Sequence, residues 1–358
     1  MSQNEFLSLG LMSGSSLDGL DICYSKIIHN GGSYQYEFIE GETIPYPDKF
    51  LDSLRNSRLL SGLDLGLLDI ALGDYFGNCC QNFVKKYHIP HLDFIASHGH
   101  TVFHFPDRRF TLPIGNGQAI ASASKYKVIN NLRLKDVINN GSGAPIVPIG
   151  DLLFFKEFTY CLNLGGIMNI SEKTTNDSII SYDIGVCNQV LNYYSKKLGF
   201  PFDENGKLAS SGSFISELFY QLNALSYYYQ KPPKSLDNGF TDDVITIIDN
   251  FISCHKHTKY NDVLSTFSHH IAFQISLVTI PDLPILSTGG GTHNSFIIDL
   301  LQTTYHRNIV IPDSKLINYK ESLIMSLMGV LFIQSQNNVL AAVTGAKQDS
   351  CCGVSYLP

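Results

Sequence analysis

The chain has 358 residues, of which 44% are hydrophobic and 16% are charged, and its 25 Lys and Arg against 32 Asp and Glu give a formal net charge of −7. This balance argues against a nucleic-acid-binding protein, because such proteins release counterions with a basic surface. The hydrophobic fraction excludes a disordered chain, and the length predicts two domains. Because the chain has no surplus of basic residues, a bound phosphate would be held mostly by backbone N–H groups.

The sequence shows no sign of export. Its N-terminus lacks the basic and apolar regions of a signal peptide, and no uninterrupted apolar run approaches the roughly 18 residues of a membrane span. The eight cysteines include no CxxC motif, which favours free thiols in a reducing compartment. We therefore expect a cytoplasmic protein that binds neither membrane nor nucleic acid.

The first half is predicted to open with a hairpin. A strand over residues 6–11 breaks at a Gly/Ser turn over 13–16 and resumes over 20–28. Apolar residues then recur at three and four residues over 63–87, which predicts a long helix. A buried strand over 93–97 is expected to end in the sequence HGHT.

The second half is predicted to repeat this pattern. A Gly/Pro/Asn-rich segment over 139–148 marks the expected boundary between domains 1–140 and 141–358. Short strands alternating with helices favour the α/β class, and a second hairpin around Gly165 and Gly166 suggests a duplicated architecture. The remaining predicted elements are strands over 158–164, 167–171, 178–184 and 285–288, and helices over 242–255, 261–280 and 321–334.

The first motif is LGLMSGSSLDGLD, over residues 9–21. Gly14 and Gly19 let the backbone curve, so that consecutive N–H groups could form an anion-binding nest. Asp18 and Asp21 could hold Mg²⁺, which prefers one or two carboxylates plus phosphate oxygens. The segment is not a Walker A loop, and a hairpin of this kind by itself needs no ligand.

Two further glycine clusters follow. Gly165-Gly166 could contact phosphate, and Asp183 lies at the end of a predicted strand, where α/β folds often place a catalytic base; it could equally cap the next helix. The triple glycine over 289–291 joins a strand to a helix and would let a nucleoside lie against the main chain. Hairpin, hairpin and triple-glycine turn in this order indicate the nucleotide clamp of actin-like kinases.

The sequence MSGSSLDGLD resembles the N-terminal signature of the 1,6-anhydro-N-acetylmuramic acid kinase family. Other family segments follow in order, and the resemblance spans roughly residues 9 to 346. These segments are SHGHT over 97–101, IGNG over 114–117, GAP and VP within 143–148, PPKS over 232–235, GGGTHN over 289–294, KE over 320–321 and VTGA over 343–346.

The resemblance implies a two-domain actin-like fold of the sugar kinase and ribonuclease H-like type, with nucleotide and sugar in the cleft between the domains. It implies an ATP- and Mg²⁺-dependent enzyme of peptidoglycan recycling, and it suggests a homodimer. Such enzymes open the anhydro ring of anhydro-N-acetylmuramic acid with water and phosphorylate O6. The products are N-acetylmuramic acid 6-phosphate and ADP.

The resemblance also implies roles for particular residues. Asp183 would be the base for the attacking water, and Glu321 would help to hold that water. Independently of the resemblance, the carboxylate of Asp18 could be a ligand of Mg²⁺. The expected ATP-binding residues are Gly14, Ser15, Ser16, Leu17, Asp18, Gly19, Leu20, Asp21, Gly165, Gly166, Asn169, Gly289, Gly290, Gly291 and Asn294. The expected sugar-binding residues are His98, Thr101, Asn131, Arg133, Gly185 and Asn188.

Some positions depart from the family pattern. DIGVCN over 183–188 stands where the family has DTGPGN, NLR over 131–133 stands for DFR, and His100 stands for Gln. These changes leave two alternatives open: a kinase for a different sugar, or a nucleotide-binding module that has lost catalysis. His98, His100 and His104 could also ligate a metal, but no nearby carboxylate or cysteine completes a site, so we expect neutral histidines.

Overall fold

The computed structural model describes residues 4–14, 17–174, 178–232, 234–236 and 239–358. The chain forms two compact units, residues 1–154 with 319–358 and residues 155–318, here called the first and second unit. This division differs from the predicted domains 1–140 and 141–358. The last segment of the chain returns to the first unit, and composition along the sequence cannot reveal such a long-range contact.

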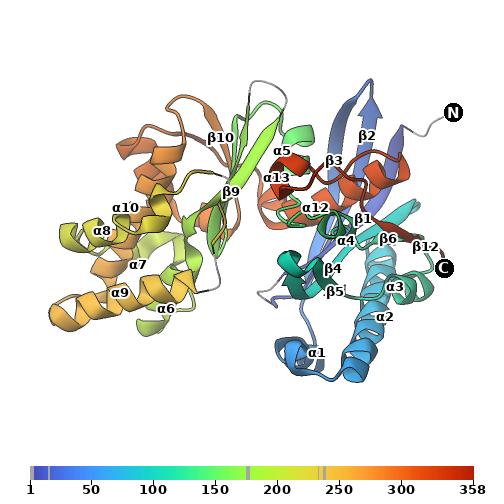
Figure 1. Ribbon diagram of the computed structural model, residues 1–358, viewed down its shortest axis with the longest axis horizontal. Helices are drawn as coiled ribbons and strands as arrows, with labels where there is room; N and C mark the ends of the chain where they lie inside the picture. Colours follow the sequence, from blue (N-terminus) through green and yellow to red (C-terminus); the bar gives the residue numbers. More distant parts are fainter. Residues whose placement is uncertain (1–3, 15–16, 175–177, 233, 237–238) are drawn as a thin grey trace. The chain divides into compact units, whose positions relative to one another are not determined.

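The first unit is built on a sheet with the strand order β12-β6-β4-β1-β2-β3, and β5 pairs with β4 (Figure 1). β1, β2 and β3 are antiparallel neighbours, whereas β4 runs parallel to β1 and β6 runs parallel to β4. The strands are β1 Glu5–Ser13, β2 Leu20–Asn30, β3 Ser33–Ile44, β4 Phe94–Phe105, β5 Phe110–Ile114, β6 Val128–Asn130 and β12 Val354–Tyr356.

Helices cover both faces of this sheet because successive side chains of β1 point to opposite sides. Leu9 and Leu11 are fully buried in the core shared with α2. Gly10 faces α12 so closely that a Cβ would lie 1.7 Å from the backbone oxygen of Ser322. The helices of this unit are α1 Asp48–Arg55, α2 Gly62–Lys86, α3 Gly117–Ser124, α4 Leu134–Ile138, α5 Pro148–Phe154 and α13 Ala341–Thr344, together with most of α12 Ser314–Ile333 and the 3-10 turns Ser57–Leu59 and Pro106–Arg108.

The second unit repeats the same strand order, β11-β10-β7-β8-β9. Three antiparallel strands, β7 Tyr160–Leu164, β8 Ile167–Lys173 and β9 Ile179–Val186, come first in the chain. β10 Pro284–Thr288 then runs parallel to β7, and β11 Asn308–Val310 runs parallel to β10. The duplicated order confirms the predicted α/β, actin-like fold.

The core of the second unit lies between this sheet and helices that include α6 and α10. Tyr160, Leu162, Val190 and Phe267 are among its buried side chains. The helices are α6 Asn188–Lys197, α7 Lys207–Ser210, α8 Ser216–Asn223, α9 Phe240–Cys254, α10 Tyr260–Val278 and α11 Ser295–Asp299. Short 3-10 or π turns cover Glu204–Gly206, Ser226–Tyr229, Gly290–His293 and Leu300–Thr304.

The predicted hairpins and the long helix over 63–87 are confirmed by β1–β2, β7–β8 and α2. The prediction that the strand over 93–97 ends in HGHT is wrong, because β4 continues through these residues to Phe105. Gly99 adopts a φ of +74°, and the register of β1 against β4 shifts between Leu11 and Ser13. Pairing with β5, a strand that the sequence analysis missed, extends β4.

Among the described residues, α12 is the one helix long and apolar enough to span a membrane. This finding corrects the expectation that no stretch approaches that length. Most of its apolar window is buried inside the protein, as in the core helix of a globular unit. All eight cysteines are free thiols, as predicted.

Candidate active site

A row of polar residues crosses four adjacent strands of the second unit. Asn163 on β7 pairs with Thr288 on β10 and with Asn169 on β8, and Asn169 pairs with Asp183 on β9. Directly paired residues of neighbouring strands share a face of the sheet, so these four side chains lie on one side of it. The row connects the predicted base to both glycine turns of this unit.

The side chain and backbone of Asp183 form four hydrogen bonds with described residues. Its Oδ2 accepts hydrogen bonds from Ser235 Oγ (3.1 Å) and from the backbone N–H of Leu236 (3.0 Å). Its backbone carbonyl accepts from the phenol of Tyr227 (2.7 Å), and its N–H donates to the carbonyl of Lys234 (3.1 Å). Burial raises the pKa of the carboxyl group, and the two hydrogen bonds to Oδ2 partly offset that effect. Among the described residues Oδ1 has no hydrogen-bond donor, and the raised pKa strengthens the carboxylate as a proton acceptor.

A buried network lies behind this strand. His270, fully buried, contacts Asn223 Oδ1 through Nδ1 (2.8 Å) and the Tyr228 hydroxyl through Nε2 (2.9 Å). Gln274 also donates to Asn223 Oδ1 (2.7 Å), so Nδ1 carries the proton and Nε2 accepts from Tyr228. The Tyr228 ring packs so tightly on Gly185 that a Cβ there would lie 2.9 Å from it. The tyrosine run thus supports β9 next to Asp183.

The network predicts a pH effect on stability. Burial lowers the pKa of His270 to about 3, below the ordinary value near 6.5, so the unfolded chain binds more protons between these values and stability falls as the pH drops through that window. Lowering the pH from 7 to 5 should therefore cost about 2 kcal/mol through this group. His270→Gln should remove that contribution from the urea unfolding free energy. The same substitution at the exposed His257 is the matched control, and equal pH slopes for wild type and His270→Gln would contradict the assignment.

The turn between β7 and β8 offers unpaired backbone donors. The carbonyls of Gly165 and Gly166 accept hydrogen bonds from the N–H groups of Cys187, Asn188 and Gln189. Within the described part of the chain, the N–H groups of the two glycines themselves have no acceptor. Two consecutive free N–H groups in a turn could contact phosphate oxygens, the role expected of this glycine pair.

A pocket of about 310 Å³ opens beside the triple glycine. Gly289 needs its φ of +82°, which glycine adopts without strain, and a Cβ on Gly290 would meet nothing within 4 Å. The pocket combines apolar surface with a few polar groups, as nucleoside sites do. It is lined by Asn188, Leu191, Asn192, Phe202, Asp203, Asn205, Gly290, Gly291, His293 and Asn294.

The pocket regroups some predicted residues and adds others. Asn188, predicted to contact the sugar, lines it together with the predicted ATP-binding glycines, and donates to the carbonyl of Leu164 (2.9 Å). The Asn294 side chain caps α11 by accepting from Ile297 N–H. Sequence reasoning missed Phe202, an apolar ring that is 54% exposed beside the glycines. Its segment carries no motif, although an exposed aromatic residue next to Pro and Asn-Gly was a usable signal.

In the first unit, the turn between β1 and β2 is described only in part. Ser15 and Ser16 lie outside the described residues. Leu20 points into the core, so only its backbone could reach a ligand. Gly14 and Leu17 form a turn closed by a hydrogen bond from Leu17 N–H to the carbonyl of Gly14.

Two carboxylates follow this turn and suit Mg²⁺. Asp18 is exposed, and Asp21 is half-buried with its Oδ1 accepting from Thr43 Oγ1 (2.6 Å). The pKa of Asp21 is raised, first by burial and also by the charge of Asp18, so the two carboxylates lie near each other. Among the described residues no three His, Cys, Asp or Glu side chains cluster as a metal site, but Mg²⁺ on a nucleotide needs only one or two carboxylates.

His98 and Arg133, both predicted to contact the sugar, are bonded to each other. Arg133 Nε donates to His98 Nε2 (2.8 Å), and the other ring nitrogen of His98 contacts the carbonyl of Gly99 (3.0 Å). Burial first, and the charge of Arg133 second, lower the pKa of His98 to about 3, so the imidazole is neutral at physiological pH. This arrangement agrees with neutral histidines rather than metal ligands. Burial also lowers the pKa of Arg133 to about 10, which still leaves it charged.

His100 belongs to a separate buried chain of hydrogen bonds. The Tyr46 phenol donates to Ser13 Oγ (2.6 Å), and Ser13 Oγ lies 2.9 Å from His100 Nδ1. The histidine that replaces a glutamine of the family pattern thus fixes the end of β1 against β4. Sequence reasoning did not identify Ser13 or Tyr46 as its partners.

The other residues predicted to contact the sugar in this unit lie around the ends of β4 and β6. Thr101 is half-buried on β4, opposite Pro113 of β5. Asn131 follows β6 with a φ of +60° and lines a pocket of about 160 Å³ that also includes His98 and Asn116. The structure therefore brings Asn131 and His98 to one pocket wall.

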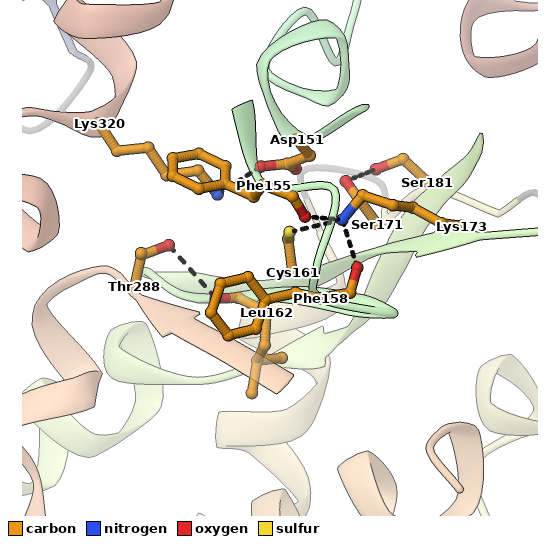
Figure 2. A network of polar contacts seen from close by, with 10 residues as sticks. All are labelled: Asp151, Phe155, Phe158, Cys161, Leu162, Ser171, Lys173, Ser181, Thr288 and Lys320. Carbon is orange, nitrogen blue, oxygen red and sulfur yellow. Dashed lines mark hydrogen bonds and ion pairs between the residues drawn. The ribbon is translucent and has the colours of Figure 1, made fainter. Parts of the chain in front are cut away.

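Glu321 lies just after a break in α12, where Tyr319 leaves the helical conformation. The residue is partly open to solvent, yet burial of the carboxyl group raises its pKa, while the charges of Arg133 and Lys320 counteract that effect. The neighbouring Lys320 forms a buried ion pair with Asp151 of α5, with Nζ and Oδ1 2.6 Å apart (Figure 2). The ion pair anchors the helix turn that carries Glu321.

Comparison with known proteins adds a consistent result. The family model described as anhydro-N-acetylmuramic acid kinase matches residues 6–358. A protein of that name from Clostridioides difficile (strain 630) is 31% identical over 376 residues, covering 97% of each chain. Another from Francisella tularensis subsp. novicida (strain U112) is 30% identical over 368 residues, covering 95% of each. Among solved structures, component A of the (R)-2-hydroxyglutaryl-CoA dehydratase of Acidaminococcus fermentans aligns with a TM-score of 0.44 at 13% identity, covering 89% of this chain and 95% of that chain.

Proposed function

We propose that this chain, which belongs to the anhydro-N-acetylmuramic acid kinase family, uses Asp183 to activate the water that opens its sugar substrate. Members of this family are ATP-using phosphotransferases that act on anhydro-N-acetylmuramic acid in peptidoglycan recycling. The chain is thus an enzyme with a small-molecule sugar and ATP as substrates. Neither a different sugar nor a loss of catalysis is favoured by any observation in the described residues.

The proposed reaction couples opening of the anhydro ring to phosphoryl transfer. The water oxygen bonds to C1 of the sugar while its proton passes to Oδ1 of Asp183, and the C1–O6 bond breaks. O6 bonds to the γ-phosphorus, whose bond to the bridging oxygen of ADP breaks. The departing O6 is captured by the phosphoryl group, so no separate acid is needed, unlike in ordinary glycosidases. Glu321 is the second residue that we assign to the water.

The single observation that carries this role is the geometry of Asp183. Within the described residues, both hydrogen bonds to its carboxylate go to Oδ2, so Oδ1 remains available to accept a proton. A general base must bind the proton of the water well, and burial raises the pKa of Asp183 in that direction. A helix cap, the alternative role, would need a bond to the start of α6, whereas Asp183 bonds to Ser235 and Leu236 instead.

We assign the nucleotide to the glycine turns and the pocket of the second unit. The free N–H groups of Gly165 and Gly166 suit phosphate oxygens, and the 310 Å³ pocket beside Gly290 suits the nucleoside. Asp18 and Asp21 would hold Mg²⁺, whose charge neutralises the transferring phosphoryl group. We assign Arg133 to the lactyl carboxylate of the sugar, because a guanidinium fork matches a carboxylate.

The test uses ¹⁸O-labelled water. The protein is incubated with Mg·ATP and anhydro-N-acetylmuramic acid, and the product is weighed by mass spectrometry. A phosphorylated sugar that carries one heavy oxygen at C1 supports coupled hydrolysis and transfer. ADP release without that sugar would indicate another acceptor, and no ADP release would indicate a binding module.

Two further properties follow from the proposed role. An enzyme that consumes ATP and recovers sugar from the cell wall would act in the cytoplasm, where ATP is available.

We also propose a homodimer, as the family resemblance suggests. Leu63, Leu67 and Ile70, four and three residues apart on α2, expose an apolar stripe that a second copy could cover. Light scattering of the purified protein would measure the oligomeric state.

A further inference from the structure

The VTGA segment near the C-terminus contacts a buried carboxylate that the proposed reaction does not use. Asp136 of α4 is fully buried. One of its oxygens accepts from Thr344 Oγ1 (2.9 Å), and the other accepts from the backbone N–H of Gly143 (2.8 Å). Among the described residues no Lys, Arg or His lies within ion-pair distance of it. A buried charge of this kind persists only when hydrogen bonds satisfy it, so these contacts define its role.

The loop after α4 is shaped around this carboxylate. The N–H of Gly141 donates to the backbone carbonyl of Asp136 (2.9 Å), and a Cβ on Gly141 would lie 2.1 Å from Asp136 Oδ2. Gly143 has a φ of +66°, where a side chain would be strained. The N–H of Ser142 donates to the carbonyl of Thr344 (2.8 Å), which ties the same loop to the VTGA segment. Only glycine fits at both turns of the loop.

The other side of the loop reaches the sugar-binding arginine. The carbonyl of Gly143 accepts from Arg133 Nη1 (2.6 Å), while Arg133 Nε donates to the neutral His98. Both acceptors are uncharged, so they fix the plane of the guanidinium without neutralising it. Within the described part of the chain, Nη2 has no hydrogen-bond partner, which leaves a donor for a ligand carboxylate.

We propose that Asp136 and Thr344 are positioning residues for sugar recognition. Thr344 holds the carboxylate of Asp136, and Asp136 holds the N–H of Gly143, so that the carbonyl of Gly143 faces Arg133 and orients the guanidinium toward the carboxylate of the substrate. The proposal rests on the proposed function, in which Arg133 binds the lactyl group. Neither residue touches the substrate. Their effect is carried by Gly143, whose N–H donates to Asp136 and whose carbonyl, in the next peptide group, accepts from Arg133.

The test is steady-state kinetics with the anhydro sugar varied at saturating Mg·ATP. Asp136→Leu leaves no oxygen to accept from the N–H of Gly143, so the loop contact is lost. Thr344→Val removes the hydroxyl but keeps the shape. Both variants should raise the KM for the sugar about tenfold, because a small misplacement of a clamping group weakens binding. The KM for ATP should be unchanged. Thr344→Ser, which retains the hydroxyl, should behave like wild type.

A double-mutant cycle with Arg133→Gln separates positioning from general damage. If Asp136 acts through Arg133, adding Thr344→Val or Asp136→Leu to Arg133→Gln should raise the KM no further. Additive effects, or a KM of wild-type size in both single variants, would overturn the proposal. If the wild type itself forms no phosphorylated sugar, the proposed function fails instead. Because Thr344→Val keeps the buried carboxylate and the shape, it still provides the test should Asp136→Leu not fold.

Discussion

Asp183→Asn is expected to reduce kcat for the anhydro sugar about a thousandfold, the scale of a lost general base. The asparagine oxygen can still accept the hydrogen bonds from Ser235 and Leu236, so the loop around it should stay in place. What is lost is the ability of Oδ1 to take a proton. ADP release in a coupled assay measures turnover, and calorimetric titration with ATP analogue measures binding, which should remain within about twofold of wild type because the pocket residues are unchanged.

Two comparisons make this expectation specific. Asp243→Asn, the same chemical change at an exposed position of α9, should leave kcat unchanged. In the wild type, kcat/KM should fall at acid pH once the base is protonated. The apparent pKa of that fall should lie above the value near 3.9 of a free aspartate, because burial raises the pKa of Asp183. Near-native turnover by Asp183→Asn would exclude Asp183 as the base.

Much of the fold could be predicted because the decisive signals are local. Hydrophobic periodicity over 63–87 predicts α2, and glycine turns between short apolar runs predict the β1–β2 and β7–β8 hairpins. The duplication of the hairpins even indicates the repeated strand order of the two sheets. These patterns depend on side chains a few residues apart.

What could not be predicted depends on contacts between distant segments. β12 pairs with β6 across more than two hundred residues of chain, and no local pattern announces that C-terminal strand. The short β6 has only three residues, too few for a clear period. For the same reason the assignment of residues 319–358 to the first unit was out of reach of a boundary drawn from composition.

The candidate site shows the same limit. Motifs identify Asp183, Arg133 and the glycine turns, because their chemistry is visible in the residue types. They do not identify the residues that orient these groups. Ser235 donates to one oxygen of Asp183, and Asp136 accepts from the N–H of Gly143, whose carbonyl accepts from Arg133. Such supporting residues are recognised by distance and burial, which a single sequence does not contain.

Lys320→Met is expected to destabilise the first unit by about 3–5 kcal/mol, the cost of leaving a buried charge without its partner. The Lys320 and Asp151 side chains are 6% and 3% exposed, and their Nζ and Oδ1 atoms lie 2.6 Å apart. Removing the ammonium group leaves the carboxylate of Asp151 unpaired in the interior, where water cannot solvate it. Urea unfolding followed by circular dichroism measures the loss. Lys347→Met, at an exposed position of the same unit, should change stability by less than about 0.5 kcal/mol.

The double variant Lys320→Met/Asp151→Leu shows whether the lost stability comes from the unpaired charge of Asp151. Two apolar side chains of similar size remove both charges together, and such replacements of buried ion pairs are often neutral or stabilising, so most of the lost stability should return. Activity need not return with it, because Lys320 also lowers the pKa of the adjacent Glu321, and without that charge the pKa of Glu321 should rise further. A stable double variant with reduced turnover would then show that the pair serves Glu321. A double variant as unstable as Lys320→Met would contradict the explanation by an unpaired charge. The packing of the lysine stem would then account for the lost stability.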